Sequence, residues 1–229
     1  DSGLALALNS VKEAQLAHRG HLLIWVAIPC TGGCPWHRVN KQYASARQKI
    51  DESRKLFANL WENCSKVLKY ALATGGAMIG IEWPQECDYW SDPVVLDFLK
   101  TIGLQRFHFH GCMYGLTSEN KDTFGTPLRK AWSVATNTAH LGKQLHKCCD
   151  GSHTHAIVKG ADAKNSECYT DAIVENIHSA FRIYSSELST NTNTLAEPAL
   201  ACSQFHPDSF KHCRQFCLTS DQNIALHPQ

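Results

Sequence analysis

The chain has 229 residues, of which 43% are hydrophobic and 19% are charged, which is ordinary for a globular protein. Its formal net charge is +1, so no overall field draws it to nucleic acid or to a membrane surface, and any nucleic-acid contact must come from a local patch. The longest apolar run, at residues 22–28, is too short to cross a bilayer, and no N-terminal stretch has the residue order of a signal peptide. The 11 cysteines are therefore expected as reduced thiols in an intracellular setting, nuclear or cytoplasmic.

Apolar periodicity and boundary residues predict alternating helices and strands along most of the chain. A capping box at Ser10–Glu13 opens a short helix that ends near Gly20, and the run at residues 21–28 is typical of a strand covered on both faces. The elements that follow are a long helix over 42–73, a buried strand over 77–84, a helix over 91–103, strands over 104–112 and 127–136, a short helix over 139–147 and a last helix over 171–184.

This order predicts an α/β fold with a mainly parallel, Rossmann-like sheet that ends in a β-hairpin. We expect one domain over residues 1–184. Residues 185–199 are polar and low in complexity, which is typical of a linker, and the tail over 200–229 has weak periodicity and is expected to be poorly ordered.

Reactive side chains end three of the predicted strands. Cys30 follows Ile-Pro in a turn that Gly32 and Gly33 make tight, Glu82 precedes Trp83-Pro84, and His110–Cys112 end the strand over 104–112. The carboxyl ends of strands in such sheets meet at one edge, so we expect these residues together. A thiol with a lowered pKa can act as a nucleophile, and a partly desolvated carboxyl could donate a proton to a ring nitrogen. That combination is the chemistry of cytosine carbon-5 methylation.

The same residues also have structural interpretations. A buried cysteine after a strand is more often a small apolar side chain than a nucleophile. Glu82 could cap a helix or pair with Arg106, and Cys34 suits packing or hydrogen bonding better than reaction.

These motifs resemble those of a known family. "IPC" with "IEWP" is similar to the Pro-Cys and Glu-Asn-Val motifs of DNA cytosine-5 methyltransferases, and "MYGL…GTPLRKAWSVATN" is similar to their later Tyr-Gly…Pro-Gln-Arg-x-Arg hairpin. More specifically, "HLLIWVAIPCTGGCPWHRVNK", "IEWPQECDYW", "FHGCMYGL" and "SECYTDAIV" resemble a methyltransferase-like domain found in dinoflagellate genomes, often beside retroelement sequences. This closer resemblance covers roughly residues 3–182.

The resemblance implies part of a class I methyltransferase fold, with Cys30 as the nucleophile, Glu82 as the acid on the base and Arg129 as the residue that orients the base or a phosphate. It also implies S-adenosylmethionine as methyl donor and nucleic acid as substrate. No Gly-x-Gly loop follows a first strand, so the cofactor half either lies upstream of Asp1 or has been lost. The alternative function is a non-catalytic, zinc-stabilised α/β module that binds nucleic acid or a protein partner, or that serves as a structural subunit of a larger assembly.

A second group of reactive residues predicts a zinc site. Cys149, His153 and His155 are spaced as Cys-x3-His-x-His on a turn opened by Asp150-Gly151, and a short loop with thiolate and imidazole ligands suits tetrahedral zinc. The fourth ligand could be His140, Cys148 or Cys112. No open coordination position with a nearby general base is evident, so we expect a structural ion. The alternative is a polar loop with solvated histidines.

Basic residues cluster modestly after the cysteine turn, at Arg38, Lys41, Arg47 and Lys49, and again at Arg129 and Lys130. If they face one cleft they would contact phosphates. The alternative is a solvated helix face, since Asp51 and Glu52 interrupt the run.

Overall fold

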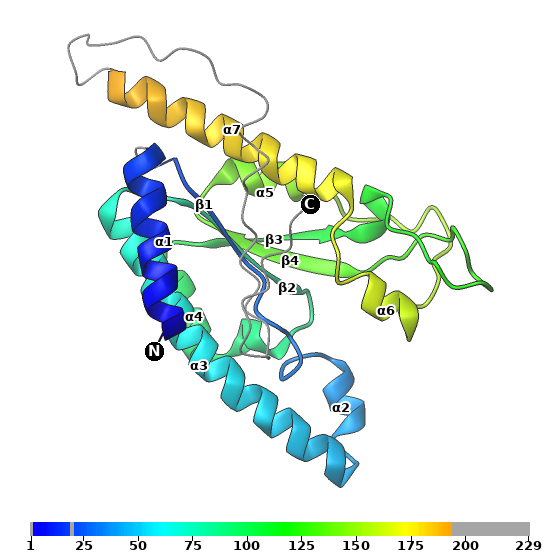
Figure 1. Ribbon diagram of the computed structural model, residues 1–229. Coiled ribbons are helices and arrows are strands. Elements are labelled where there is room, and N and C mark those ends of the chain that lie inside the picture. Colours follow the sequence, from blue (N-terminus) through cyan, green and yellow to red (C-terminus); the bar gives the residue numbers. More distant parts are fainter. Residues whose placement is uncertain (1, 19–20, 194–229) are drawn as a thin grey trace.

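The computed structural model describes residues 2–18 and 21–193. The predicted tail over 200–229 and the end of the predicted linker lie outside the described residues. Within this part of the chain one sheet forms, in the order β1-β2-β4-β3 (Figure 1). Its strands are β1 (Leu23–Val26), β2 (Met78–Pro84), β3 (Gln105–His110) and β4 (Ala131–Thr136).

The prediction of a mainly parallel, Rossmann-like sheet is wrong. Only β1 and β2 pair in parallel, whereas β4 pairs antiparallel with both β2 and β3, so the sheet is mixed and mostly antiparallel. The physical reason lies in the polarity of the last two strands. Five of the six residues of β4 are buried, while β3 begins with exposed Gln105 and Arg106. The more apolar strand therefore takes the inner position beside β2, and the half-polar strand takes the edge.

The prediction that reactive residues gather where three strands end does not depend on the sheet being mainly parallel. Because β3 is antiparallel to β4 and β4 is antiparallel to β2, β3 runs in the same direction as β2. The carboxyl ends of β1, β2 and β3 and the amino end of β4 therefore lie at the same end of the sheet, here called the site edge. Pairing of Pro84 with Trp132 and of His110 with Ala131 marks that edge.

Helices cover both faces of the sheet (Figure 1). One face carries α1 (Ser2–His18), α3 (Ala44–Thr74) and α4 (Pro93–Ile102), and the other carries α5 (Ala139–Leu145) and α7 (Asp171–Asn193). Shorter helices are α2 (Trp36–Asn40) and α6 (Ala161–Asn165), with 3-10 turns at Asp88–Ser91 and Gly111–Tyr114. α1 begins well before the predicted capping box. α7 continues past residue 184, so the first part of the predicted linker is helical.

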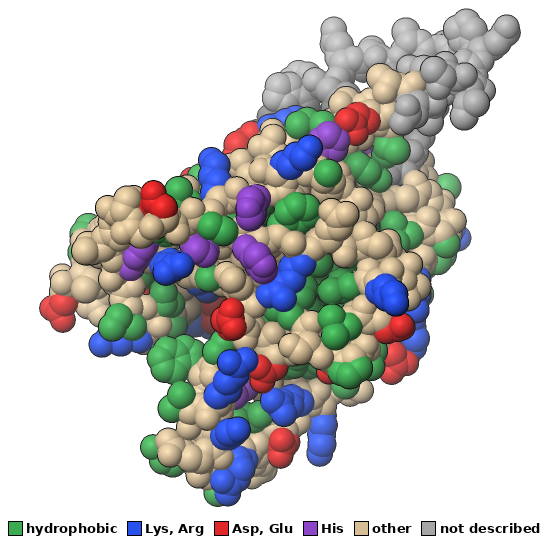
Figure 2. Space-filling model, turned by 180° about the vertical axis from the view of Figure 1, so that it is seen from behind, with side chains coloured by type: hydrophobic (Ala, Val, Ile, Leu, Met, Phe, Trp, Pro, Cys, Tyr) green, Lys and Arg blue, Asp and Glu red, His purple; other side chains and the backbone are tan. Residues whose placement is uncertain are grey.

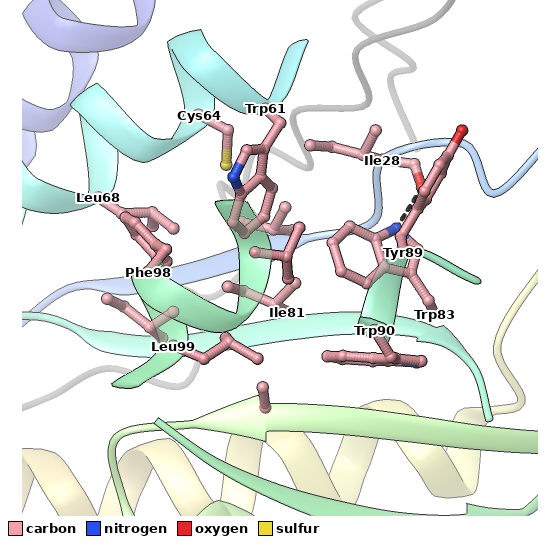
Figure 3. Close-up of a cluster of buried hydrophobic side chains, with 14 of the residues drawn as sticks. Ile28, Trp61, Cys64, Leu68, Ile81, Trp83, Tyr89, Trp90, Phe98 and Leu99 are labelled. Atoms are coloured by element: carbon pink, nitrogen blue, oxygen red, sulfur yellow. Dashed lines mark hydrogen bonds between the residues drawn. The ribbon is translucent and has the colours of Figure 1, made fainter. Parts of the chain in front are cut away.

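The core under α3 anchors the start of the cysteine turn. Trp61 and Leu68 of α3 pack with Trp83 of β2 and with Phe98 of α4 (Figure 3). The indole nitrogen of Trp83 donates a hydrogen bond of 2.8 Å to the carbonyl of Ile28, drawn as the dashed line in Figure 3. This bond fixes the chain two residues before Cys30.

The opposite core joins β3 and β4 to α5 and α7. Leu141 and Leu145 of α5 and Ile173 of α7 are fully buried against Phe109 and Val134. Both faces of β2 and β4 are therefore covered, which explains why both strands are mostly apolar.

The predicted helix over 91–103 is confirmed by its ends. The Asp92 side chain accepts a hydrogen bond from the backbone N–H of Val94, proline occupies the first turn, and Gly103 closes the helix in the left-handed region. None of the described helices combines the length and the apolar character that a membrane span requires.

Candidate functional site

The turn that carries Cys30 is held by backbone and side-chain contacts. The N–H of Gly33 donates to the carbonyl of Cys30 at 2.8 Å, and Arg54 Nε of α3 donates to the carbonyl of Gly32 at 2.9 Å. A Cβ on Gly33 would lie 2.9 Å from the sulfur of Cys87, so only glycine allows this approach. The two glycines therefore press the turn onto the segment that follows β2.

Cys30 and Cys34 form a hydrogen-bonded thiol pair at the two ends of this turn. The hydrogen bond from Cys30 lowers the pKa of Cys34 to about 6, with further help from the Trp36 N–H and from the nearby His37 and Lys130. The same hydrogen bond, together with burial, raises the pKa of Cys30. At neutral pH the proton therefore resides on Cys30 and the negative charge on Cys34.

Glu82 is a buried carboxyl on β2 with one unsatisfied oxygen. The Tyr169 hydroxyl donates to Oε2 at 2.5 Å, and the Trp25 indole donates in turn to that hydroxyl at 3.1 Å. Oε1 is shielded from solvent and has no partner. Burial raises the pKa of Glu82 to about 7, although the Tyr169 hydrogen bond and the Lys130 charge oppose the rise. A large fraction of the carboxyl is thus protonated at neutral pH.

Lys130 is the cation that acts on Glu82, whereas the sequence predicted Arg129 for this role. Lys130 precedes β4 at the site edge, and its charge acts on Glu82 and on Cys30. It donates to the backbone carbonyl and hydroxyl of Ser166. Arg129 instead lies near His110 and His155. Burial is the main cause that lowers the pKa values of these histidines, and the charge of Arg129 lowers them further. Neighbouring residues in an extended segment point to opposite sides, and only the strand register decides which one faces Glu82.

A thiolate, a thiol, a carboxylic acid and an ammonium group therefore come together at the site edge. Such a set can attack an electrophilic ring carbon and protonate a ring nitrogen. We call Cys30, Cys34, Glu82 and Lys130 the thiol–carboxyl cluster.

A second cluster, the metal cluster, consists of Cys112, Cys149, His153 and His155. One ligand atom of each lies within 4.8 Å of all the others, and the sulfur of Cys149 lies 3.7 Å from Nε2 of His153 and 3.5 Å from Nε2 of His155. Ligands at about 2.0–2.3 Å from a tetrahedral zinc ion stand roughly 3.3–3.8 Å apart. The group could therefore hold a metal ion such as zinc.

Local hydrogen bonds position the metal cluster. Nδ1 of His110 accepts a 2.8 Å hydrogen bond from the N–H of Cys149, which ties the loop to the end of β3. Asp150 accepts from the N–H of Ser152 at 2.9 Å and opens the turn that returns His153 and His155 toward Cys149. Cys112 arrives from the 3-10 turn directly after β3.

The structure distinguishes the three candidates for the fourth ligand. Cys112 completes the group. His140 lies on α5, with its Nε2 2.9 Å from a carboxylate oxygen of Glu187, and the Cys148 thiol points to the carbonyl of His108. The predicted ligands Cys149, His153 and His155 do come together, and His140 does not join them.

The turn at Gly32 and Gly33 does not fit S-adenosylmethionine. The glycines at the site edge, Gly32 and Gly33, are covered by Tyr89, Arg54 and Cys87, whose atoms would lie within 3.0 Å of an added Cβ. The turn is thus filled by the chain itself and forms no cradle for a nucleoside. Comparisons with protein-family models, with curated proteins and with solved structures gave no match.

Proposed function

We propose that the chain is a methyltransferase-like domain that performs the base-activating half of cytosine-5 chemistry on nucleic acid. The observation that carries the proposal is Glu82, a buried carboxyl with a pKa of about 7 and one unpartnered oxygen, placed beside a thiol pair. The resemblance to DNA cytosine-5 methyltransferases supports the same roles for Cys30 and Glu82.

The chemistry proceeds in balanced proton transfers. The Cys30 sulfur adds to carbon 6 of the cytosine ring as its proton passes to the Cys34 thiolate, while Glu82 protonates the ring nitrogen N3. The ring carbon 5 becomes electron-rich and takes a proton, or in deuterated water a deuteron, from solvent. The original proton of carbon 5 then leaves to solvent, the sulfur is expelled and takes its proton back from Cys34, and the N3 proton returns to Glu82, which restores cytosine. Lys130 holds negative charge in the cluster by electrostatic attraction.

Hydrogen exchange at cytosine carbon 5 tests this step. The full chain, incubated with a cytosine-containing oligonucleotide in deuterated water, should place deuterium at carbon 5, as read by mass spectrometry of the nucleosides. Cys30→Ala should abolish exchange, and Glu82→Gln should slow it by about 10²–10⁴-fold, the usual contribution of a general acid. Cys148→Ser, at an exposed thiol outside the thiol–carboxyl cluster, is the matched control and should exchange normally. Exchange that survives Cys30→Ala would remove the proposal.

We also infer that the metal cluster binds zinc as a structural ion, because four protein ligands leave no open position. Elemental analysis of the purified chain should give about one zinc per chain. Cys112→Ala should lose the ion, while His140→Ala should keep it. Loss of zinc from His140→Ala with retention in Cys112→Ala would contradict the assigned ligand set.

The second candidate is a non-catalytic, zinc-stabilised module that binds nucleic acid or joins a larger assembly. The observation that favours it is the shielding of Glu82 Oε1 from solvent, because a general acid must reach its base. Full zinc occupancy with no deuterium exchange on any oligonucleotide would decide for this candidate.

A further inference from the structure

The lobe formed by residues 36–55, here called the α2 lobe, displays large apolar side chains to solvent. Trp36 is 57% exposed, Val39 is 55% exposed and Tyr43 is 60% exposed, all within α2 and the turn that leads to α3. Large apolar side chains exposed along one short segment can form a contiguous patch, and such patches mark interaction surfaces. The same residues pack nothing in either core of the domain.

The same lobe carries a cavity lined mainly by cationic side chains. A cavity of about 240 Å³ is lined by His37, Arg38, Lys41, Arg47 and Arg54, with Ile50, Asp51 and Asp88. Figure 2 shows Lys and Arg side chains gathered over this projecting part of the molecule. Asp88 pairs with Arg38 at 2.8 Å and with Arg54 at 3.5 Å. Nη1 of Arg47 donates to two backbone carbonyls, and these bonds do not involve its Nη2. Among the described residues no ion pair involves Lys41 or Lys49. The lobe therefore keeps positive charge for an anionic partner.

The α2 lobe is joined directly to the thiol–carboxyl cluster. Arg54 lines the cavity and also donates to the carbonyl of Gly32. Asp88 lines the cavity and donates its N–H to the carbonyl of Gly33 at 2.7 Å. The turn between Cys30 and Cys34 thus forms the shared boundary of cavity and cluster. A polymer lying along the lobe would therefore lie next to this turn.

We propose that the α2 lobe binds single-stranded nucleic acid, with bases stacked on Trp36 and Tyr43 and phosphates held by Lys41 and Arg47. Aromatic faces can stack only on bases that are unpaired, and a basic groove with exposed aromatic groups is the recurring form of a single-strand binding surface. The inference names the substrate class of the proposed function, and it stands on the lobe's own residues if the thiol chemistry fails.

Fluorescence anisotropy with a labelled 12-nucleotide thymidine strand, titrated with the full chain, tests the surface. We expect binding that weakens with salt, and Trp36→Ala should weaken it by roughly tenfold or more, since each stacked base contributes strongly. Lys41→Gln should reduce the slope of log affinity against log salt by about 0.7, the value for one phosphate contact on a single strand. Trp36→Phe, which keeps an aromatic face, should restore most of the binding.

Matched controls lie elsewhere on the surface. Phe124→Ala removes an aromatic group that is 78% exposed outside the lobe, and Lys100→Gln removes an exposed charge on α4. Both should bind as the unaltered chain does. Equal affinity for a duplex of the same length, or unchanged binding by Trp36→Ala, would overturn the inference. Strand binding without carbon-5 exchange would uphold the α2 lobe and refute only the thiol chemistry.

Discussion

Glu82 is a residue whose burial works against its own ionisation. Its pKa rises from the usual 4.5 to about 7, so between these pH values the folded chain holds a proton that the unfolded chain has released. The stabilisation is fully present below pH 4.5 and is lost as the pH rises through about 7. The change amounts to roughly 3 kcal/mol, from about 1.4 kcal/mol for each pKa unit.

Glu82→Gln should therefore stabilise the chain at high pH. The amide is neutral and has the shape of the protonated carboxyl, so the variant should match the unaltered chain at pH 4 and exceed its free energy of unfolding by roughly 3 kcal/mol at pH 8. Urea unfolding across this pH range provides the measurement. A variant less stable than the unaltered chain at pH 8 would show that the fold favours the carboxylate, and so that the pKa of Glu82 is not raised.

Cys34 should be the thiol that alkylates most readily in the cysteine turn. Its lowered pKa of about 6 makes it a thiolate at pH 7, whereas the raised pKa of Cys30 keeps that sulfur protonated. Iodoacetamide modification, mapped by peptide mass spectrometry, should show a midpoint near pH 6 for Cys34. Cys30→Ala removes the S–H donor and should slow the reaction at pH 7 by roughly tenfold. Faster modification of Cys30 than of Cys34 would reverse the assigned proton.

At the scale of elements, α4 shows how local signals fix a helix. Asp92 caps its first turn, and Gly103 ends it with a φ of 76°, where a Cβ is strained. Asp92→Ala and Gly103→Ala should each cost about 1 kcal/mol of stability in denaturant unfolding. Asp97→Ala, at an exposed position of the same helix, is the control and should change stability by less than about 0.5 kcal/mol. Equal losses from all three variants would remove the capping explanation.

The sequence predicts elements better than their arrangement. The helix over 42–73 and the strand over 77–84 agree with α3 and β2 within two residues, because periodicity and glycine stops are local signals. The order of the strands depends on which of β3 and β4 is the more apolar, and no local signal within either strand gives that comparison. β4 is buried on both faces and β3 is not, and this difference gives β4 the place beside β2.

The same limit applies to the candidate site. Cys149, His153 and His155 are predicted because they share one short loop, whereas Cys112 joins them only through the end of β3. Whether Arg129 or Lys130 reaches Glu82 depends on the register of β4, which no local pattern records. Residues brought together across the sheet are therefore the ones that sequence reasoning assigns least well.

For the whole molecule, the two cores on opposite faces of the sheet should respond differently to metal removal. The metal cluster joins the end of β3 to the loop over 149–155, which follows α5, whereas α3 packs in the core on the other face of the sheet. A zinc chelator should increase amide hydrogen exchange over residues 111–128 and 146–158 and leave α3 protected. Loss of protection in α3 at the same rate would show that the domain unfolds as one unit.

Because β4 is an inner strand, the sheet cannot be completed during synthesis until β4 has been made. During synthesis, α1, β1, α3 and β2 emerge first and can assemble, but the second side of β2 stays without a partner until residue 136 has been synthesised. An apolar strand with an open edge invites pairing with other chains. The nascent chain therefore passes through a stage that depends on prompt arrival of β4, and pauses in translation before that point would favour aggregation over folding.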